Sequence, residues 1–219
     1  MKLGEIITRK NKGEVIALAK RAATDAKLQW STGIEVLLSA LVSHPRQTPR
    51  VQDTKAHPGE LVVLKKWLMK YWKGFESRPS VRTSNVSKTI PDPILGHLIS
   101  ARLPKLTKSD LELVQYAHRL EMGAENINGL LLEEYLALEL AAFGWHCAWG
   151  ETVKAVDFVN ANGRLLQVKN RDNSENSSAS RVRQGTVIEK WHRIRSTKVE
   201  YKWEVLNEMN HTTKFDESK

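Results

Sequence analysis

The stretch VDFVNANGRLLQVK, residues 156–169, consists of two short apolar segments joined by an Asn-Gly pair. Asn-Gly between alternating apolar residues is the strongest short-range signal for a β-hairpin. A three-residue loop from Ala161 to Gly163, with Gly163 in the left-handed region, fits this turn. The sequence therefore predicts two antiparallel strands.

The length of the loop decides which side chains face each other. With three loop residues, Asp157 lies opposite Gln167, whereas a two-residue loop shifts the pairing by one and separates them. We prefer the first register because it segregates polar from apolar side chains on both strands. Since side chains alternate along a strand, one face carries Leu165, Gln167 and Lys169, and the other carries Val156, Phe158, Leu166 and Val168.

Asp157, Gln167 and Lys169 then bring a carboxylate, an amide oxygen and an ammonium group to one end of the hairpin. A hard cation such as Mg²⁺ takes oxygen ligands from carboxylates, carbonyls, waters and phosphates. A lysine beside it can position the attacking water and stabilise charge that develops on a phosphate. The alternative is an ordinary amphipathic hairpin with a solvated polar face.

The composition fits a protein of one domain, or a catalytic domain with a helical extension, in 219 residues. We find no apolar run long enough to span a membrane and no signal peptide. A single cysteine, Cys147, excludes an intramolecular disulfide and a multi-cysteine zinc site and favours a reducing cytoplasm.

The net charge of +9 is unevenly distributed along the chain. Residues 1–105 carry 19 Lys and Arg against 8 Asp and Glu, residues 106–163 carry 3 against 9, and residues 164–219 carry 12 against 8. A basic chain with an acidic segment suits a polyanion-binding protein with a metal site, although charge alone does not distinguish DNA from RNA.

Helical periodicity dominates the first part of the chain. We expect a basic, helical N-terminal region at 1–90 and a catalytic and DNA-recognition core at 91–219, which together could form one compact domain. Helices are predicted at 12–30, 32–42, 60–73, 94–102, 107–120 and 129–143, the last capped by Asn128, and strands at 145–149 and 198–206. Residues 187–195 could be a strand or the end of a helix.

The predicted helix before the strands offers a further carboxylate. Its apolar stripe is formed by Leu132, Leu136, Leu140 and Phe143, and both Glu133 and Glu134 border that stripe. A carboxylate in this position can lean over a neighbouring sheet. The alternative for either residue is a solvent-facing side chain, which is the usual place for glutamate.

A helix with Glu, a strand with Asp, a turn and a strand with Gln-x-Lys together resemble the PD-(D/E)xK nuclease superfamily. The resemblance implies an α/β (α+β) fold with a mixed central sheet flanked by helices. In its Gln-x-Lys branch about eleven residues separate the apolar-Glu pair from a Gly-aromatic pair. Leu132-Glu133 and Gly144-Trp145 fit that spacing, which favours Glu133 over Glu134. Val156 stands where the family has Pro, and Gln167 replaces the usual acid, which removes one negative charge that Glu133 could supply.

A closer resemblance, over roughly residues 95–205, is to the SinI-type (AvaII-like) type II restriction endonucleases. Its longer motifs are AENINGLLLEEY (124–135), GWHCAWG (144–150), LLQVKNR (165–171), SENSS (174–178), RVRQGT (181–186) and IEKW (188–191). The resemblance implies Mg²⁺-dependent cleavage of double-stranded DNA at GGWCC, where W is A or T. It also implies a prokaryotic cytoplasm and a cognate DNA methyltransferase acting on the same site.

On this reading Asp157, Gln167 and the Val168 carbonyl hold the metal, with help from Glu133, and Lys169 orients the attacking water. Cutting both strands of a near-palindromic site requires two active sites, so we expect a homodimer. Arg and Asn or Gln can read guanine and adenine in the major groove, and Ser and Lys can contact phosphates. The predicted DNA-binding residues are Arg171, Asn173, Ser174, Asn176, Arg181, Arg183, Gln184, Lys190 and Arg193.

Three alternatives remain open at this point. The chain could be a repair or modification-dependent nuclease on the same fold, a DNA-binding protein with a decayed site, or an RNA-binding protein. The predicted recognition segment at 170–184 could equally be a polar surface loop, and Trp191 within the basic segment fits a core position better than a DNA contact.

Overall fold

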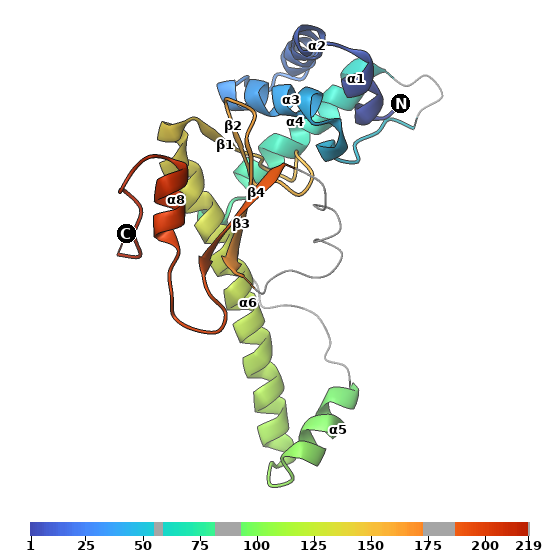
Figure 1. Cartoon of the computed structure of the whole chain (residues 1–219). Helices are drawn as coiled ribbons and strands as arrows, with labels where there is room; N and C mark the ends of the chain where they lie inside the picture. The colour runs from blue at the N-terminus through green and yellow to red at the C-terminus, as the bar shows by residue number, and fades with distance from the viewer. Residues whose placement is uncertain (55–58, 82–92, 173–186, 219) are drawn as a thin grey trace.

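A four-stranded mixed sheet lies at the centre of the computed structural model, in the order β1-β2-β3-β4 (Figure 1). The structure describes residues 1–54, 59–81, 93–172 and 187–218. β1 (Trp145–Cys147), β2 (Phe158–Asn160) and β3 (Leu165–Arg171) are antiparallel neighbours, and β4 (Ile188–Ile194) runs parallel to β3. The predicted mixed sheet with flanking helices is confirmed.

The hairpin between β2 and β3 has the register predicted for a three-residue loop. Phe158 pairs with Leu166 and Val159 pairs with Leu165. The amide of Gly163 donates to the carbonyl of Asn160 at 2.8 Å, and Gly163 has a φ of +84°. A side chain there would be strained, so glycine is what allows this tight turn.

Side chains of the hairpin alternate between two hydrophobic clusters, one on each face of the sheet. Val159 and Leu165 pack with the N-terminal helices, whereas Phe158, Leu166 and Val168 pack on the opposite face. The polar face expected from the sequence is therefore not solvated, since Leu165 is fully buried there. The prediction that Val156 shares a face with Phe158 is wrong. Val156 lies before β2 begins and packs in the same cluster as Leu165.

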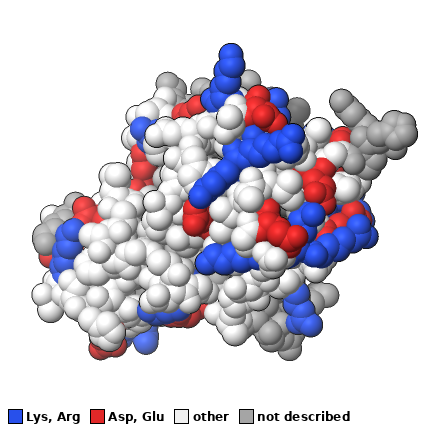
Figure 2. Space-filling model, turned by 90° about the horizontal axis from the view of Figure 1, so that it is seen from above, with Lys and Arg blue, Asp and Glu red and all other residues white. Residues whose placement is uncertain are grey.

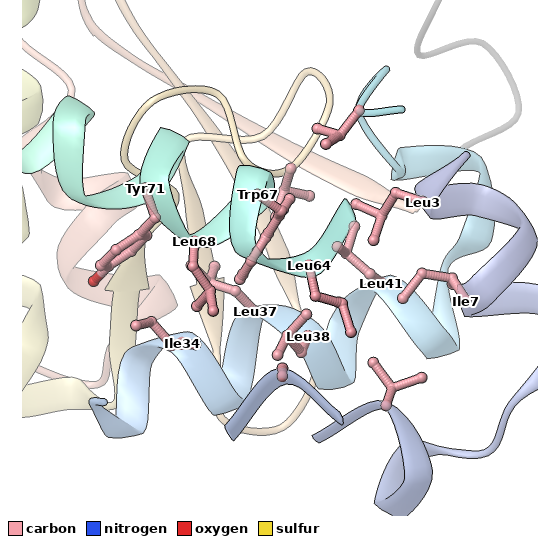
Figure 3. Packing of buried hydrophobic residues seen from close by; sticks show 14 of the residues in the cluster. Leu3, Ile7, Ile34, Leu37, Leu38, Leu41, Leu64, Trp67, Leu68 and Tyr71 are labelled. Atoms are coloured by element: carbon pink, nitrogen blue, oxygen red, sulfur yellow. The ribbon is translucent and has the colours of Figure 1, made fainter. Parts of the chain in front are cut away.

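The N-terminal helices form most of the first cluster (Figure 3). They are α1 (Leu3–Arg9), α2 (Lys12–Asp25), α3 (Thr32–Ser43) and α4 (Glu60–Glu76), with short 3₁₀ turns at Pro45–Gln47 and Pro79–Val81. Asn11 and Ser31 cap α2 and α3 through their side chains. The helices predicted in this region are confirmed, except that α2 ends at Asp25 and α1 was not foreseen.

The loop between β1 and β2, which leads to Asp157, rests on α4. A Cβ atom at Gly74 would lie 2.2 Å from the backbone nitrogen of Gly150, so the two backbones touch. The indole of Trp67 donates to the carbonyl of Thr152 at 2.9 Å. The N-terminal helices thus support the loop from which Asp157 projects.

A long helix, α6 (Lys108–Glu139), runs along the other face of the sheet and extends well beyond it beside α5 (Pro93–Arg102) (Figure 1). Thr107 caps α6 in a capping box with Asp110, as the predicted helix start required. The predicted second helix start at Asn128 is wrong, because the helix continues through it. A 3₁₀ turn, Leu140–Phe143, ends the segment at Gly144, whose φ is +77°.

The strand predicted at 198–206 is also wrong. Tyr201 forms only an isolated bridge with Ile194, and α8 (Trp203–Met209) follows. Trp203 and Leu206, three residues apart, lie on one helical face and pack with Trp191 in the second cluster. Trp191 is a core residue, as predicted, and β4 is a strand.

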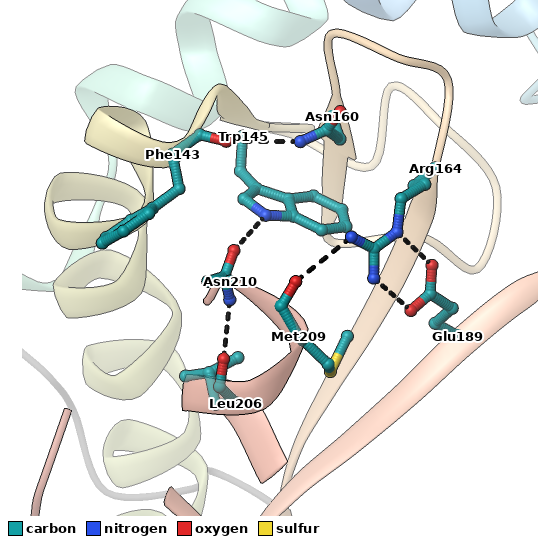
Figure 4. A network of polar contacts seen from close by, with 8 residues as sticks. All are labelled: Phe143, Trp145, Asn160, Arg164, Glu189, Leu206, Met209 and Asn210. Atoms are coloured by element: carbon teal, nitrogen blue, oxygen red, sulfur yellow. Dashed lines mark hydrogen bonds and ion pairs between the residues drawn. The ribbon is translucent and has the colours of Figure 1, made fainter. Parts of the chain in front are cut away.

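A polar network fastens the turn end of the hairpin to β4 and α8 (Figure 4). The Arg164 guanidinium donates twice to the Glu189 carboxylate, at 2.7 Å each, and once to the carbonyl of Met209. It also lies over the ring of Trp145, whose indole donates to Asn210. Among the described residues no helix has the length and apolar character needed to cross a membrane.

Candidate active site

The four residues predicted to be catalytic line one cleft of about 1390 Å³. Glu133 comes from α6, Asp157 from the residue before β2, and Gln167 and Lys169 from β3. The opposite wall belongs to the N-terminal helices and the β1–β2 loop. Three separate segments thus place carboxylates, an amide and an ammonium group around one space.

Asp157 is held by the backbone of the neighbouring strand. The amide of Val168 donates to its Oδ2 at 2.7 Å, and its own amide donates to the carbonyl of Leu166 at 2.9 Å. The first of these bonds fixes the carboxylate beside Gln167 and Lys169. Val168, predicted to supply a carbonyl ligand, therefore contacts the Asp157 carboxylate directly through its amide.

Glu133 is half-buried, and its electrostatic surroundings are unfavourable for a charge. Burial, together with the nearby Asp157 carboxylate, raises the pKa of its carboxyl from 4.5 to about 8, and Lys169 opposes both effects. Two carboxylates near each other in a partly dry cleft form a place where a cation would be stabilised.

Glu134, the other candidate on α6, points elsewhere. Its carboxylate accepts hydrogen bonds from the backbone and hydroxyl of Ser80 and pairs with Arg78 at 3.2 Å. It ties α6 to the 3₁₀ turn at Pro79–Val81. The geometry thus favours Glu133 as the residue of the cleft, in agreement with the sequence preference.

Gln167 is buried, and its Oε1 atom has no hydrogen-bond partner among the described residues. An unpaired buried acceptor costs about 1–3 kcal/mol, so such atoms are rare unless a ligand satisfies them. Lys169 follows two residues later on the same face of β3, half-buried, opposite His192 of β4. It also lines a second cleft of about 680 Å³ together with Glu133 and Arg171.

These residues fit a hard divalent cation. The described part of the chain has no group of three or more His, Cys, Asp or Glu that could bind a metal. The cleft instead offers two carboxylates and the unpaired Gln167 oxygen, which suits an ion that keeps waters and takes further oxygens from a phosphate. The raised pKa of Glu133 points the same way.

The wall opposite the catalytic residues carries basic side chains, of which the sequence singles out only Lys70, as part of a basic helix at 60–73 that could contact phosphates. They are Lys2, Arg50, Lys70, Arg78 and Lys154, all lining the larger cleft. For all of these except Lys154, the excess positive charge of residues 1–105 was the available signal, but it could not show which side chains face the site. Seen from above, Lys and Arg lie among Asp and Glu and uncharged areas and do not form one continuous patch (Figure 2).

Three of the predicted DNA-binding residues lie in the described part of the chain. Arg171 ends β3 beside the second cleft and pairs with Glu125 at 3.4 Å, and Lys190 is exposed on β4. Arg193 donates to Asn170 at 2.9 Å and pairs with Glu217, so it fastens β4 to β3 and to the C-terminal segment. Asn173, Ser174, Asn176, Arg181, Arg183 and Gln184 lie outside the described residues.

Comparison with known proteins gives a consistent result. Residues 50–219 match the family model described as SinI restriction endonuclease. The chain is 43% identical over 195 residues to the type II restriction enzyme SinI of Salmonella infantis, covering 85% of this chain and 82% of that enzyme. It is 44% identical over 121 residues to the type II restriction enzyme Eco47I of Escherichia coli, which covers 53% of this chain and 52% of that enzyme.

Proposed function

Because the chain belongs to the SinI restriction endonuclease family and is a type II site-specific deoxyribonuclease, we propose that it cleaves duplex DNA at GGWCC in a Mg²⁺-dependent reaction. The observation that supports the chemistry best is the convergence of Glu133, Asp157, Gln167 and Lys169 on one cleft. We further propose that α6 and the β1–β4 sheet form a PD-(D/E)xK core, since the order and spacing of these four residues match its pattern.

Asp157, Gln167 and Glu133, with the carbonyl of Val168, would hold the cation. When bound, Mg²⁺ supplies positive charge that stabilises the transition state of phosphoryl transfer. The Val168 amide orients Asp157, so the carboxylate is already in place before substrate enters. Burial of the site strengthens every charge interaction inside it.

We assign to Lys169 the positioning of the water that attacks phosphorus. Its ammonium group lies close enough to Glu133 to lower the pKa of that carboxyl. From there it can donate to the attacking water or to a phosphate oxygen, and stabilise negative charge as it develops. The attacking water loses its proton to solvent in the open cleft, and the leaving 3′ oxygen takes up a proton from the same source.

The basic wall of the larger cleft supports DNA as the substrate. Lys2, Arg50 and Lys154 are exposed there and can contact phosphates on the far side of the catalytic residues. We propose that base recognition comes from the segment that begins at Arg171, as the sequence predicts, with Lys190 contributing to phosphate binding. A homodimer, a cognate DNA methyltransferase and a location in a prokaryotic cytoplasm remain parts of the same proposal.

Digestion of an unmodified, fully sequenced plasmid tests the proposal. With Mg²⁺ we expect discrete fragments whose ends map to GGWCC, and no cleavage with EDTA. Lys169→Ala should reduce cleavage by at least about 1000-fold while binding is retained. Lys20→Ala, a change on α2 away from the cleft, is the matched control and should cut normally.

Wild-type cleavage by the Lys169→Ala protein would refute its assignment. Binding without cleavage by the wild-type protein would favour a decayed site, and cleavage restricted to methylated plasmid would favour a modification-dependent nuclease.

A further inference from the structure

The outer part of α6 carries an apolar stripe that is largely exposed in the described structure, with only Ile127 half-buried. Its members alternate in steps of four and three residues and are Leu113, Ala117, Leu120, Ala124, Ile127 and Leu131. Leu113 is 65% exposed, Leu120 42% and Leu131 45%. A stripe of this period on one face of a helix is the pattern of a coiled-coil seam, in which a second helix covers the apolar positions.

The neighbouring helix α5 does not serve as that cover. It lies against the other side of α6, where a Cβ atom at Gly96 would meet the side chain of Gln115 at 3.4 Å. Leu111, Gln115 and Arg119 are partly buried on that side. At about 100° per residue, these three positions lie roughly opposite Leu120 on the helix. The α5–α6 arm, residues 93–131, therefore presents its stripe outward.

We infer that the stripe is the surface through which two copies of this chain pair, with α6 of one copy packed against α6 of the other. This inference rests on the proposed function, because cutting both strands of a two-fold symmetric site requires two active sites in one particle. An isologous contact needs a surface that complements itself, and a seam of leucines and isoleucine interspersed with alanines does so. Ala117 and Ala124 allow the two helix axes to approach closely.

The charge of the arm favours a second copy over DNA as its partner. The arm has four basic residues, Arg102, Lys105, Lys108 and Arg119, and four acidic ones, Asp110, Glu112, Glu121 and Glu125. It is therefore neutral within a chain of net charge +9. A neutral arm does not repel its copy, whereas a phosphate-binding surface needs an excess of positive charge.

The stripe and the cleft lie on opposite sides of the same helix. Leu131 and Glu133 are two residues apart, which is about 200° around the helix, and Glu133 lines both clefts. Pairing of the two α6 helices would therefore fix the position of one active site relative to the other through a single rigid element.

Sedimentation velocity of the full chain at micromolar concentration tests the inference. The wild-type protein should sediment as a dimer, and Leu120→Glu as a monomer, with the dissociation constant raised at least about 100-fold because a charge replaces a buried apolar side chain. Met122→Glu is the matched control: it lies on the same helix, is 49% exposed and faces away from the stripe, and it should stay dimeric. Leu113→Glu should repeat the effect, and circular dichroism checks that each variant is folded.

A wild-type protein that is monomeric, or a folded Leu120→Glu protein that remains dimeric, would overturn the pairing surface. Plasmid cleavage separates this result from the proposed function. A monomeric Leu120→Glu protein should accumulate nicked circles where the wild type produces linear DNA. If the wild type pairs through the stripe but leaves DNA intact, the surface stands and the proposed function fails.

Discussion

The two ends of β3 are built in opposite ways. Next to its start, the Arg164 guanidinium forms an ion pair with Glu189 and donates a hydrogen bond to the carbonyl of Met209. It also lies over the ring of Trp145. Further along the strand, Gln167 has a buried oxygen without a partner among the described residues, and Lys169 lines the cleft. One end is satisfied and stabilises the hairpin, while the other keeps groups whose partners would arrive with a cation and DNA. Stability and function are thus separated along one strand of seven residues.

Asp157→Asn should give the largest effect, because it should reduce cleavage without reducing stability. We expect cleavage to fall by at least about 1000-fold, because the cleft loses a charge that would hold the cation. Stability should not fall, since an Asn oxygen can still accept from the Val168 amide and the repulsion with Glu133 disappears. Single-turnover cleavage and thermal unfolding in EDTA measure the two effects. Activity within tenfold of wild type would contradict this role of Asp157.

The converse change is Arg164→Ala at the satisfied end. It removes a bidentate ion pair that is partly exposed, a hydrogen bond and a ring contact, which together contribute about 2 kcal/mol. For a chain of this length that corresponds to a Tm lower by about 5 °C. Cleavage at 20 °C should stay within a few-fold of wild type. A large loss of cleavage without loss of stability would show that the two ends are not separate.

Glu133→Gln tests how unfavourable a negative charge is at this position in the cleft. The carboxyl has a pKa of about 8 in the folded protein against 4.5 ordinarily, so its contribution to stability is fully present below pH 4.5 and is lost as the pH rises towards 8. A neutral amide avoids that loss. In EDTA the free energy of unfolding of the variant should therefore match that of wild type at pH 4.5 and exceed it at pH 8. Chemical denaturation at both pH values checks this, and an equal difference at both would contradict it.

The smallest expected effect on stability is at Gln167. Gln167→Leu removes the unpaired buried oxygen and should stabilise the metal-free protein by about 1 kcal/mol while abolishing cleavage. Gln167→Glu should do the reverse in EDTA, since it adds a third carboxylate near Asp157 and Glu133, and Mg²⁺ should then stabilise it more than wild type. Thermal unfolding with and without Mg²⁺ distinguishes the pair. No change from Gln167→Leu in either assay would contradict this view of the residue.

The sequence predicted best what depends on neighbours in the chain. The register of the hairpin follows from a short turn with glycine at a left-handed position, and it brought Asp157 to the edge of β3 as expected. The choice of Glu133 over Glu134 came from the spacing that the family resemblance implies, and Glu133 is the residue that lines the cleft.

The errors arose where distant packing decides the structure. Tyr201 to Leu206 are good strand formers, but Trp203 and Leu206 are buried by the second cluster on one face of a helix. Asn128 looked like a helix start, yet α6 continues, since extending an existing helix is easier than starting a new one. The basic wall could not be predicted either, because its residues come from widely separated parts of the chain.

The backbone contact between Gly74 and Gly150 limits how far this enzyme can be reduced to a smaller part. The match to the family model begins at residue 50, but the cluster beneath the Asp157 loop includes Leu3, Ile34 and Leu41. A fragment cut at that point would expose Leu64 and Trp67 and leave the loop on an unsupported helix. The first three helices therefore belong to the minimal nuclease, and engineering that exchanges them for another module should preserve the surface that α4 rests on.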